Sequence, residues 1–208
     1  MKVGRGENTL FIDSKEAFGD GSHPSTRLAL LLLDELLCRE KDRPDIVSEW
    51  SLDAGCGTGI LALAAATLGG LKVFAVDIDP HAIEAAAENL KRNTRPGSMV
   101  CLAQGELSCA RGPFGLVLAN LAPSVHVRAK SVLWQAVAPG GWLILSGFFK
   151  IQKGMVLGFY VRQGATEEGC LLDEGWAASL LKRPVFPNPA SAQAGRGVAG
   201  QKVSPGRC

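Results

Sequence analysis

The sequence has little of what metal centres, disulfide scaffolds, membrane spans or nucleic-acid surfaces require. Its six cysteines form no C-x-x-C pair and its three histidines are scattered, so we expect no metal site and a reduced, cytoplasmic chain. No uninterrupted apolar run approaches a membrane span, and the N-terminus lacks the apolar core of a signal peptide. A formal net charge of +2 gives no strong attraction to DNA or to an anionic membrane. We therefore expect a soluble protein with neither DNA nor a membrane as partner, and we take a monomer as the expected oligomeric state.

A single stretch organises the rest of the chain, and it reads SLDAGCGTGILALAAATLGGLKVFAVDIDP over residues 51–80. An apolar lead into Asp53 runs into a glycine loop, a helix follows over 60–68, and a second strand over 72–76 ends at Asp77. Strand, glycine loop, helix, strand and acid is the order of a nucleotide-binding βαβ unit. The stretch therefore predicts a nucleotide-type ligand beside the loop.

The loop and the acid carry the chemistry of that unit. Gly55, Gly57 and Gly59 let the backbone turn sharply and let a ligand approach with no Cβ in the way. The helix that follows directs its free N–H groups and its positive dipole end at the loop, which suits a carboxylate or a phosphate. Asp77 lies 22 residues after Gly55, at the end of a strand, where a carboxylate can bind both hydroxyls of a ribose.

The spacing of the glycines separates two classes of ligand. A dinucleotide fingerprint, G-x-G-x-x-G, would need a third glycine where this chain has Ile60. The pattern that starts at Asp53 is D-x-G-x-G-x-G, which resembles motif I of the class I S-adenosylmethionine-dependent methyltransferases. Taken alone, the pattern also fits a tight turn in an unrelated α/β protein.

The remaining apolar periodicities predict alternating helices and strands on both sides of this unit. Further strands are expected over 9–12, 99–103, 114–119 and 142–146, with a turn at 139–141, and a hairpin over 165–173 and 176–182. Further helices are expected over 25–38, from residue 80 to a turn at 93–98, over 125–137 and over 151–162.

The helix that starts at Pro80 has the clearest pattern. Asp79 is a good N-cap and proline suits the first helical position. The spacing i, i+3, i+4, i+7 predicts one buried face made of Ile83, Ala86, Ala87 and Leu90.

Several polar residues lie outside these patterns. His23 is a candidate catalytic base, because an imidazole can take up and release a proton near neutral pH, but we favour a loop histidine that hydrogen-bonds the backbone before Pro24. Cys56 fills the glycine loop more plausibly than it acts as a nucleophile. His81 and His126 fall on predicted helices and are expected at the surface.

Five segments together carry a more specific signal. They are AFGDGSHPSTRLAL (17–30), LDAGCGTGILALAA (52–65), VDIDPHAIEAAAENLKRN (76–93), VLANL (117–121) and PGGWLILSG (139–147). In this order they resemble the PrmA family, whose members methylate protein eleven of the large ribosomal subunit. The resemblance covers residues 13–183 and implies an α/β, Rossmann-like class I methyltransferase. Its sheet would have seven mostly parallel strands, with the last strand antiparallel and helices on both faces.

The resemblance also implies a cofactor and its binding residues. The cofactor would be S-adenosylmethionine, with Asp77 on the ribose, Gly55 under the methionine part and Thr26 in contact with it. Glu106 follows the third strand at the edge where an adenine would lie. The full set of expected cofactor-binding residues is Phe18, Gly19, Thr26, Asp53, Gly55, Gly57, Gly59, Asp77, Glu106 and Asn120.

Catalysis is assigned to Asn120 and Leu121. The sulfonium already activates the methyl group, so the site needs to position a neutral amine for in-line attack. An amine is mostly protonated at neutral pH, so the site must favour its deprotonated form. The side-chain carbonyl of Asn120 and the neighbouring backbone carbonyl of Leu121 can accept the amine's N–H bonds. Asn120 resembles the first residue of the Asn-Pro-Pro-Tyr motif of amino-group methyltransferases. Alternatively, Asn120 is only a turn residue at the end of a strand.

Three departures from the family pattern stand out. Asp20 replaces a usual threonine, which puts a charge in the active-site loop, and Gly115 replaces a usual aspartate at a position that is more plausibly structural. Family members also carry an N-terminal domain that grips the ribosomal protein. Here we expect only an extension over 1–16, then the catalytic domain over 17–186. A tail over 187–208 has no aromatic residue and is expected to be disordered.

Three functions follow from this reading. The leading one is methylation of a protein amino group, a lysine side chain or an N-terminal amine, most plausibly on a large-subunit ribosomal protein. A methyltransferase acting on another protein or on a small amine is the second. A nucleic-acid base is disfavoured because residues 120–123 offer no aromatic ring for it to stack on. The third is a non-catalytic relative that binds S-adenosylmethionine.

Overall fold

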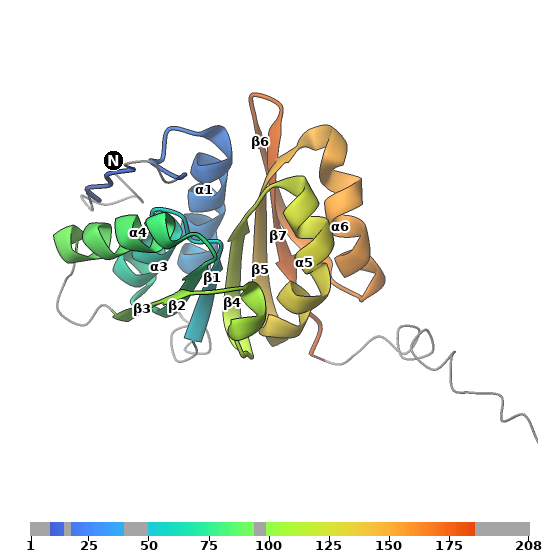
Figure 1. Cartoon of the computed structure of the whole chain (residues 1–208). Coiled ribbons are helices and arrows are strands. Elements are labelled where there is room, and N and C mark those ends of the chain that lie inside the picture. Colours follow the sequence, from blue (N-terminus) through green and yellow to red (C-terminus); the bar gives the residue numbers. More distant parts are fainter. Residues whose placement is uncertain (1–8, 15–17, 40–49, 94–98, 186–208) are drawn as a thin grey trace, which may run out of the picture.

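A computed structural model describes residues 9–14, 18–39, 50–93 and 99–185. The strands in these ranges form one seven-stranded sheet in the order β3-β2-β1-β4-β5-β7-β6 (Figure 1). The strands are β1 Trp50–Ala54, β2 Lys72–Asp77, β3 Met99–Gln104, β4 Phe114–Asn120, β5 Val137–Phe149, β6 Thr166–Asp173 and β7 Trp176–Lys182.

The directions of the strands confirm the predicted class I methyltransferase sheet. Strands β1 to β5 pair in parallel with one another, whereas β7 runs antiparallel to both of its neighbours, β5 and β6. Strand β1 lies between β2 and β4, so the order of the strands reverses there. Ligands of open α/β sheets bind at such a reversal, outside the carboxyl ends of the strands.

Helices cover both faces of the sheet. They are α1 Pro24–Arg39, α3 Ile60–Gly69, α4 Pro80–Asn93, α5 Pro123–Ala136 and α6 Lys153–Arg162, with short 3₁₀ helices η1 Leu107–Cys109 and η2 Lys150–Gln152. Figure 1 shows α1, α3 and α4 on one side and α5 and α6 on the other. Among the helices that the structure describes, none is long and apolar enough to cross a membrane.

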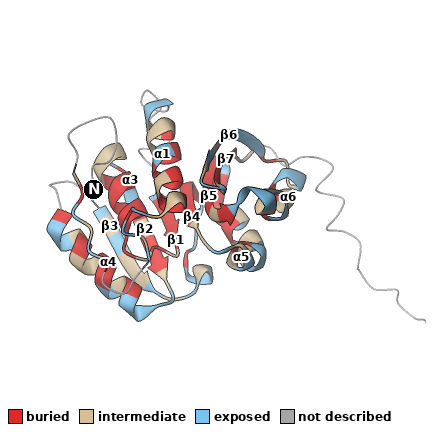
Figure 2. Cartoon of the chain, turned by 90° about the horizontal axis from the view of Figure 1, so that it is seen from above, coloured by how far each residue is buried: buried red, intermediate tan, exposed pale blue. Residues whose placement is uncertain are grey.

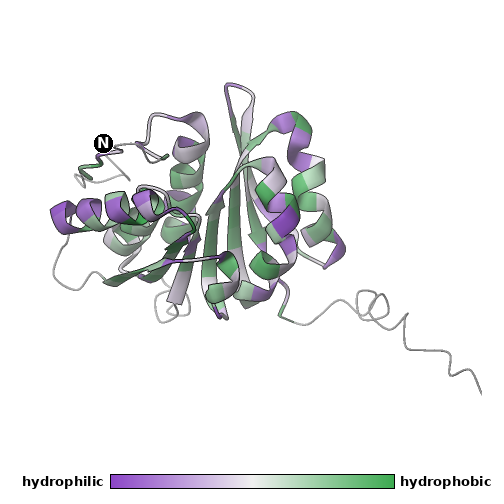
Figure 3. Cartoon of the chain, in the orientation of Figure 1, coloured by the Kyte–Doolittle hydropathy of each residue, from purple (hydrophilic) through white to green (hydrophobic). Residues whose placement is uncertain are grey.

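Two apolar cores, one on each face, hold the layers together. Strand β5 serves both, because alternate side chains of a strand point to opposite faces. Trp142 and Ile144 pack in the core under α1 and α3, and Leu143 and Leu145 pack in the core under α5 and α6. The burial map and the hydropathy map agree, with buried apolar residues on the sheet and on the inner helix faces (Figures 2 and 3).

The strand expected over residues 9–12 is wrong. Thr9 is a single bridge residue, and residues 10–14 form no regular structure. The backbone of residues 11 and 13 hydrogen-bonds with side chains of α4, where a strand would hydrogen-bond with the backbone of a neighbouring strand. Asn93 accepts from the N–H of Phe11 and donates to its carbonyl, both at 2.8 Å, and Asn89 makes the same pair of bonds with Asp13, both at 2.9 Å.

These asparagines also explain why the predicted buried face of α4 is only partly right. Ala86 is buried, but Ile83, Ala87 and Leu90 are half-buried. The buried row is Ala82, Ala85, Ala86, Asn89 and Asn93. The helix is therefore rotated relative to its apolar stripe, so that two amides face inward. Asp79 caps the helix as expected, since its carboxylate accepts from the N–H of His81 at 2.9 Å.

The turn expected at residues 139–141 lies inside a longer strand. Strand β5 begins at Val137, and its register against β4 shifts between Phe114 and Leu116. Gly140, at φ +75°, takes up the irregularity. The predicted hairpin is confirmed, with Glu174 and Gly175 both left-handed at φ 49° and 82°. Of the turn expected over 93–98, Asn93 is the last residue of α4, and residues 94–98 lie outside the described residues, as does the tail over 187–208.

Candidate active site

A cavity of about 580 Å³ opens at the carboxyl ends of β1, β2, β3 and β4. This volume is typical of a site for a small organic ligand. The predicted residues all line it except Asp53 and Gly59; those on its wall are Phe18, Gly19, Thr26, Gly55, Gly57, Asp77, Glu106, Asn120 and Leu121. The structure thus brings together residues that lie up to about a hundred positions apart in the sequence.

The glycine loop packs tightly against two other segments. A Cβ on Gly55 would lie 2.4 Å from Cδ2 of Leu121, and one on Gly57 would lie 2.4 Å from the carbonyl oxygen of Phe18. Both glycines also have left-handed φ angles, +71° and +51°. Thr58 fastens the loop to residues 18–19, because its N–H donates to the carbonyl of Phe18 at 3.1 Å and its hydroxyl to that of Gly19 at 2.5 Å.

Asp77 is both part of the wall and a support for the loop. One carboxylate oxygen accepts from the N–H of Gly57 at 2.9 Å, and the other from the N–H of Asp79 at 3.0 Å. Each carboxylate oxygen can accept more than one hydrogen bond, so both retain capacity for hydroxyl donors in the cavity. The exposed side chain of Ile78 lines the cavity beside it.

Asp53 and Gly59 lie behind the cavity wall. Asp53 is buried, and its carboxylate accepts from the N–H of Ala62 in the first turn of α3 at 2.9 Å. Burial, with a smaller contribution from the charge of Asp77, raises the pKa of Asp53 to about 7. Gly59 precedes α3, and a Cβ there would lie 3.1 Å from Cβ of Ala86, so its role is to let α3 approach α4.

Asn120 ends β4 and has one free hydrogen-bonding atom. Its amide nitrogen donates to the hydroxyl oxygen of Thr26 at 3.2 Å. Its carbonyl oxygen is buried and has no hydrogen-bond partner among the residues that the structure describes. A buried polar atom left unsatisfied costs about 1–3 kcal/mol, so this oxygen marks a place for a donor. The start of α1 is held by Ser146, whose hydroxyl donates to the carbonyl of Ser25 at 2.8 Å.

A second cavity of about 280 Å³ adjoins the first. The two share four residues, Phe18, Asn120, Leu121 and Ala122. The smaller cavity is completed by His23, Ser25, Pro123, Gly147 and Trp176. Asn120 and Leu121 therefore lie at the junction of two cavities, which is the arrangement that transfer between two ligands requires.

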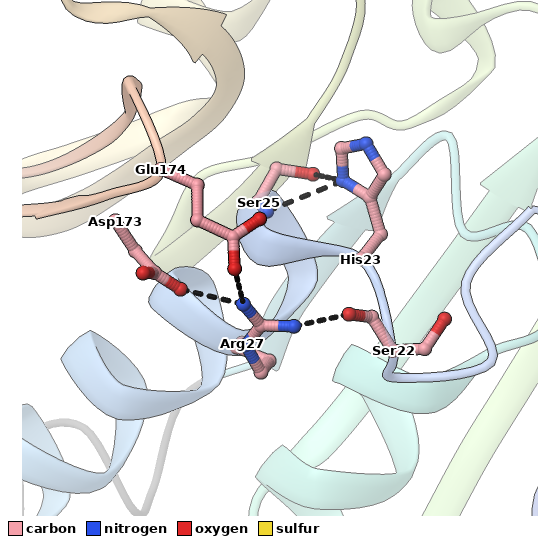
Figure 4. Close-up of polar contacts among 6 residues, drawn as sticks. All are labelled: Ser22, His23, Ser25, Arg27, Asp173 and Glu174. Carbon is pink, nitrogen blue, oxygen red and sulfur yellow. Dashed lines mark hydrogen bonds and ion pairs between the residues drawn. The ribbon is translucent and has the colours of Figure 1, made fainter.

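Aromatic rings form one side of the smaller cavity. The ring of His23 contacts Phe18 and Trp176 edge to face, with centroids 5.1 and 4.5 Å apart, and Trp176 stacks on Phe149 at 4.1 Å. Nδ1 of His23 lies 2.8 Å from the hydroxyl of Ser25 and accepts from its N–H at 3.2 Å (Figure 4). His23 thus caps α1 as a structural loop histidine, but its partner follows Pro24 instead of preceding it.

The surface position expected for His126 is wrong. It is 1% exposed, its Nε2 lies 2.7 Å from the carbonyl oxygen of Ser146, and its ring meets Phe148 edge to face. Burial lowers the pKa of His126, so it is held neutral. His81 is exposed as expected. Burial raises the pKa of the Cys56 thiol far above its ordinary value, which leaves it a filler of the loop and a poor nucleophile.

Two of the departures from the family pattern, Asp20 and Gly115, lie outside both cavities. The Asp20 carboxylate accepts from the N–H of Ser22 at 2.8 Å and from its hydroxyl at 2.6 Å, and these bonds lower its pKa. Its charge is therefore turned toward its own loop. Gly115 is buried at the register shift of β4, where a Cβ on Gly141 would already lie 3.0 Å from its carbonyl oxygen.

The wall residues that sequence reasoning missed include two groups that lie outside the predicted loops. One face of α5 lines the larger cavity with Val125, Arg128, Ala129 and Val132. Their spacing, i, i+3, i+4 and i+7, is a signal that could have identified them. Gly147 of β5 and Trp176 of β7 line the smaller cavity, and no local sequence pattern predicts that they do. In the described ranges, no group of three or more His, Cys, Asp or Glu side chains could hold a metal ion.

Comparison with known proteins gives a consistent result. The family model described as "Ribosomal protein L11 methyltransferase (PrmA)" matches residues 3–184. The ribosomal protein L11 methyltransferase of Citrifermentans bemidjiense is 35% identical over 180 residues, which cover 86% of this chain and 57% of that protein. That of Methylococcus capsulatus is 37% identical over 167 residues, which cover 80% of this chain and 54% of that protein. The chain thus spans little more than half the length of the curated relatives it matches.

Solved structures agree on the fold. The ribosomal protein L11 methylase of Lactobacillus delbrueckii subsp. bulgaricus superposes with a TM-score of 0.71 at 26% identity, covering 86% of each chain. The precorrin-6y C5,15-methyltransferase of Geobacter metallireducens superposes with a TM-score of 0.62 at 13% identity, over 84% of this chain and 97% of that one. The second similarity bears on the fold alone.

Proposed function

The chain belongs to the PrmA family of ribosomal protein L11 methyltransferases, and on this premise we propose that it methylates amino groups of a protein with S-adenosylmethionine as methyl donor. The acceptor proposed is a lysine side chain or an N-terminal amine of ribosomal protein L11. The proposal assigns the larger cavity to the cofactor and the smaller cavity to the acceptor amine.

The larger cavity fits the cofactor in its polarity as well as in its size. Asp77 would accept hydrogen bonds from the ribose hydroxyls, for which its oxygens keep free lone pairs. Gly55 and Gly57 would underlie the methionine part, with Thr26 beside it. Ile78 and Leu107 supply apolar wall near Glu106, which suits an adenine ring. Bound there, S-adenosylmethionine would supply a methyl group already activated by its positive sulfur.

The smaller cavity fits an amine that approaches Asn120. The free carbonyl oxygen of Asn120 and the backbone carbonyl oxygen of Leu121 would accept its N–H bonds and direct its lone pair toward the larger cavity. A Cβ on Gly147 would lie 2.4 Å from the Leu121 oxygen and 3.0 Å from Oδ1 of Asn120. The glycine therefore keeps a methyl group away from both oxygens, beside which the nitrogen would sit.

The apolar and aromatic walls would favour the neutral form of the amine. Phe18, Trp176 and Pro123 offer few donors or charges, and a poorly solvated site disfavours the ammonium form of the acceptor. Nδ1 of His23 is already engaged by Ser25, so we assign it no proton transfer. The step asked of the protein is positioning, and the acceptor loses its proton to solvent.

The observation that carries the proposal is the unpartnered Oδ1 of Asn120 at the junction of the two cavities. The test is transfer of label from radioactive S-adenosylmethionine to ribosomal proteins, taken from cells that lack their own PrmA. Label in ribosomal protein L11, transferred far more slowly by the Asn120→Ala variant, is the expected result. Label in another protein would keep the chemistry and change the substrate. No label, with cofactor binding shown separately by calorimetry, would contradict the proposal.

A further inference from the structure

The side chain of Arg27 joins two segments that are far apart in the sequence. Arg27 lies in the first turn of α1, and one of its terminal nitrogens is 2.6 Å from Oδ2 of Asp173 and 3.5 Å from Oε1 of Glu174. The other terminal nitrogen donates to the backbone carbonyl of Ser22. Figure 4 shows the guanidinium between the loop that carries Ser22 and the turn between β6 and β7.

Both segments contribute side chains to the lining of the smaller cavity. Ser22 is followed directly by His23, and the same loop begins with Phe18. Glu174 lies two residues before Trp176. The rings of His23 and Trp176 meet at 4.5 Å on the cavity side. Arg27 lines neither cavity and bridges the segments beside that ring contact.

Each segment has a second attachment, but none of these crosses from one segment to the other. The loop is fastened to the glycine loop through Thr58, at Phe18 and Gly19. The hairpin turn is fastened to the end of β5 by the N–H of Lys150, which donates to the carbonyl of Gly175 at 2.8 Å. The polar contacts of Arg27 connect the loop directly with the hairpin turn, next to the ring contact of His23 with Trp176.

We propose that Arg27 is a positioning residue, which holds the His23 loop (residues 18–23) and the β6–β7 turn (residues 173–176) in their relative positions and thereby sets the shape of the acceptor cavity. The inference rests on the proposed function, because it concerns the cavity assigned to the amine. The fork of a guanidinium suits this role, since it can bind a carboxylate and a carbonyl in fixed directions at once. Both Arg27 and Asp173 are 38% exposed, and exposed ion pairs contribute little to stability. The effect of Arg27 should therefore appear in acceptor binding and much less in unfolding.

The test replaces Arg27 by Met, which keeps the aliphatic stem and removes the guanidinium. The control is Arg92→Met, because Arg92 makes a similarly exposed ion pair with Asp13 at 3.1 Å and lines neither cavity. With unmethylated ribosomal protein L11 as acceptor, Arg27→Met should raise the acceptor KM about tenfold, with kcat and the cofactor Kd changed less than about twofold. Arg92→Met should change none of the three. Arg27→Lys should give an intermediate KM, because it keeps the charge without the fork.

A second readout is independent of methyl transfer. Amide hydrogen exchange should speed up together in residues 18–23 and 173–176 of Arg27→Met, and in neither segment of Arg92→Met. An unchanged acceptor KM, or unchanged exchange in both segments, would overturn the inference. If the wild-type chain transfers no methyl group to any acceptor, the proposed function fails, and the exchange result still decides whether Arg27 couples the two segments.

Discussion

The amide nitrogen of Asn120 lies 3.2 Å from the hydroxyl oxygen of Thr26, which leaves the carbonyl oxygen of Asn120 facing the space beside Gly147. In this orientation of the amide, its N–H₂ donates to Thr26 and its carbonyl oxygen is the end that is available to a ligand. An amide that could rotate freely would offer its N–H₂ as often as its oxygen. The contact therefore favours a ligand that donates hydrogen bonds, as a neutral amine does.

Replacing Asn120 by Ala should lower kcat about 100-fold, because the acceptor nitrogen loses one of the two oxygens that aim it. The cofactor Kd should change little, since most of the larger cavity is untouched. Single-turnover methyl transfer and calorimetry with S-adenosylhomocysteine measure the two quantities separately. Equal losses in both would instead assign Asn120 a structural role.

Replacing Asp77 by Ala should weaken cofactor binding about 100-fold, because charge-assisted hydrogen bonds to the ribose are lost together with the support of the glycine loop at Gly57. Asp79→Ala is the matched control. This substitution removes the cap of α4, at a cost of about 1 kcal/mol of stability. Residue 79 does not line the cavity. An Asp77 variant with wild-type affinity in calorimetry would refute the ribose assignment.

Gly147→Ala should abolish acceptor turnover, because its Cβ would lie 2.4 Å from the carbonyl oxygen of Leu121. Gly147 also has a left-handed φ of +90°, which costs a non-glycine residue about 1–2 kcal/mol by itself. Gly70→Ala controls for that cost, since Gly70 has φ +62° and nothing within 4 Å of its Cβ position. Activity lost in the first variant and kept in the second is the expected pattern, with a larger fall in melting temperature for Gly147→Ala because its Cβ also clashes with the backbone of Leu121. Comparable activity in the two would argue against an amine site at Gly147.

The buried Asp53 predicts a pH dependence of stability. Its folded pKa of about 7 lies above the unfolded value of 3.8, so between these pH values the native state holds the proton more tightly than the unfolded chain. The free energy of unfolding should therefore fall as pH rises through this window, and the loss should be complete above about pH 7. Asp53→Asn keeps an oxygen for the N–H of Ala62 and removes the titration. The melting temperature of the variant minus that of the wild type should therefore be larger at pH 8 than at pH 5.

His126 provides the reason for comparing variant with wild type at each pH. Its pKa is lowered by burial, so its own contribution runs the other way, and stability is lost as pH falls below its unfolded pKa. That contribution is common to both proteins and cancels in the difference. A difference in melting temperature that does not change from pH 5 to pH 8 would contradict the account of Asp53.

Local spacing accounts for what the sequence predicted well. Gly55 and Asp77 belong to one βαβ unit, and a short connected unit leaves them little choice of relative position. The hairpin at Glu174-Gly175 is similarly local. Thr26 and Asn120 were placed through the family resemblance, and the structure joins them by a direct hydrogen bond.

Long-range packing accounts for what the sequence did not predict. Asn89 and Asn93 face inward because residues 11–13 need partners for their backbone, which no pattern within α4 reveals. His126 is buried because the carbonyl of Ser146 lies on the adjacent strand β5. Asp53 has the spacing of a cofactor ligand but is turned toward Ala62 of α3. In each case the deciding partner comes from another element of the fold.

The most direct test of the two-cavity account is a crystal structure of the chain with S-adenosylhomocysteine and unmethylated ribosomal protein L11. The account predicts the cofactor product in the larger cavity, with its ribose on Asp77. It predicts an amine nitrogen of the acceptor within hydrogen-bond distance of Oδ1 of Asn120 and of the carbonyl oxygen of Leu121. An amine bound away from these two oxygens, with the smaller cavity left empty or filled by another group, would contradict it.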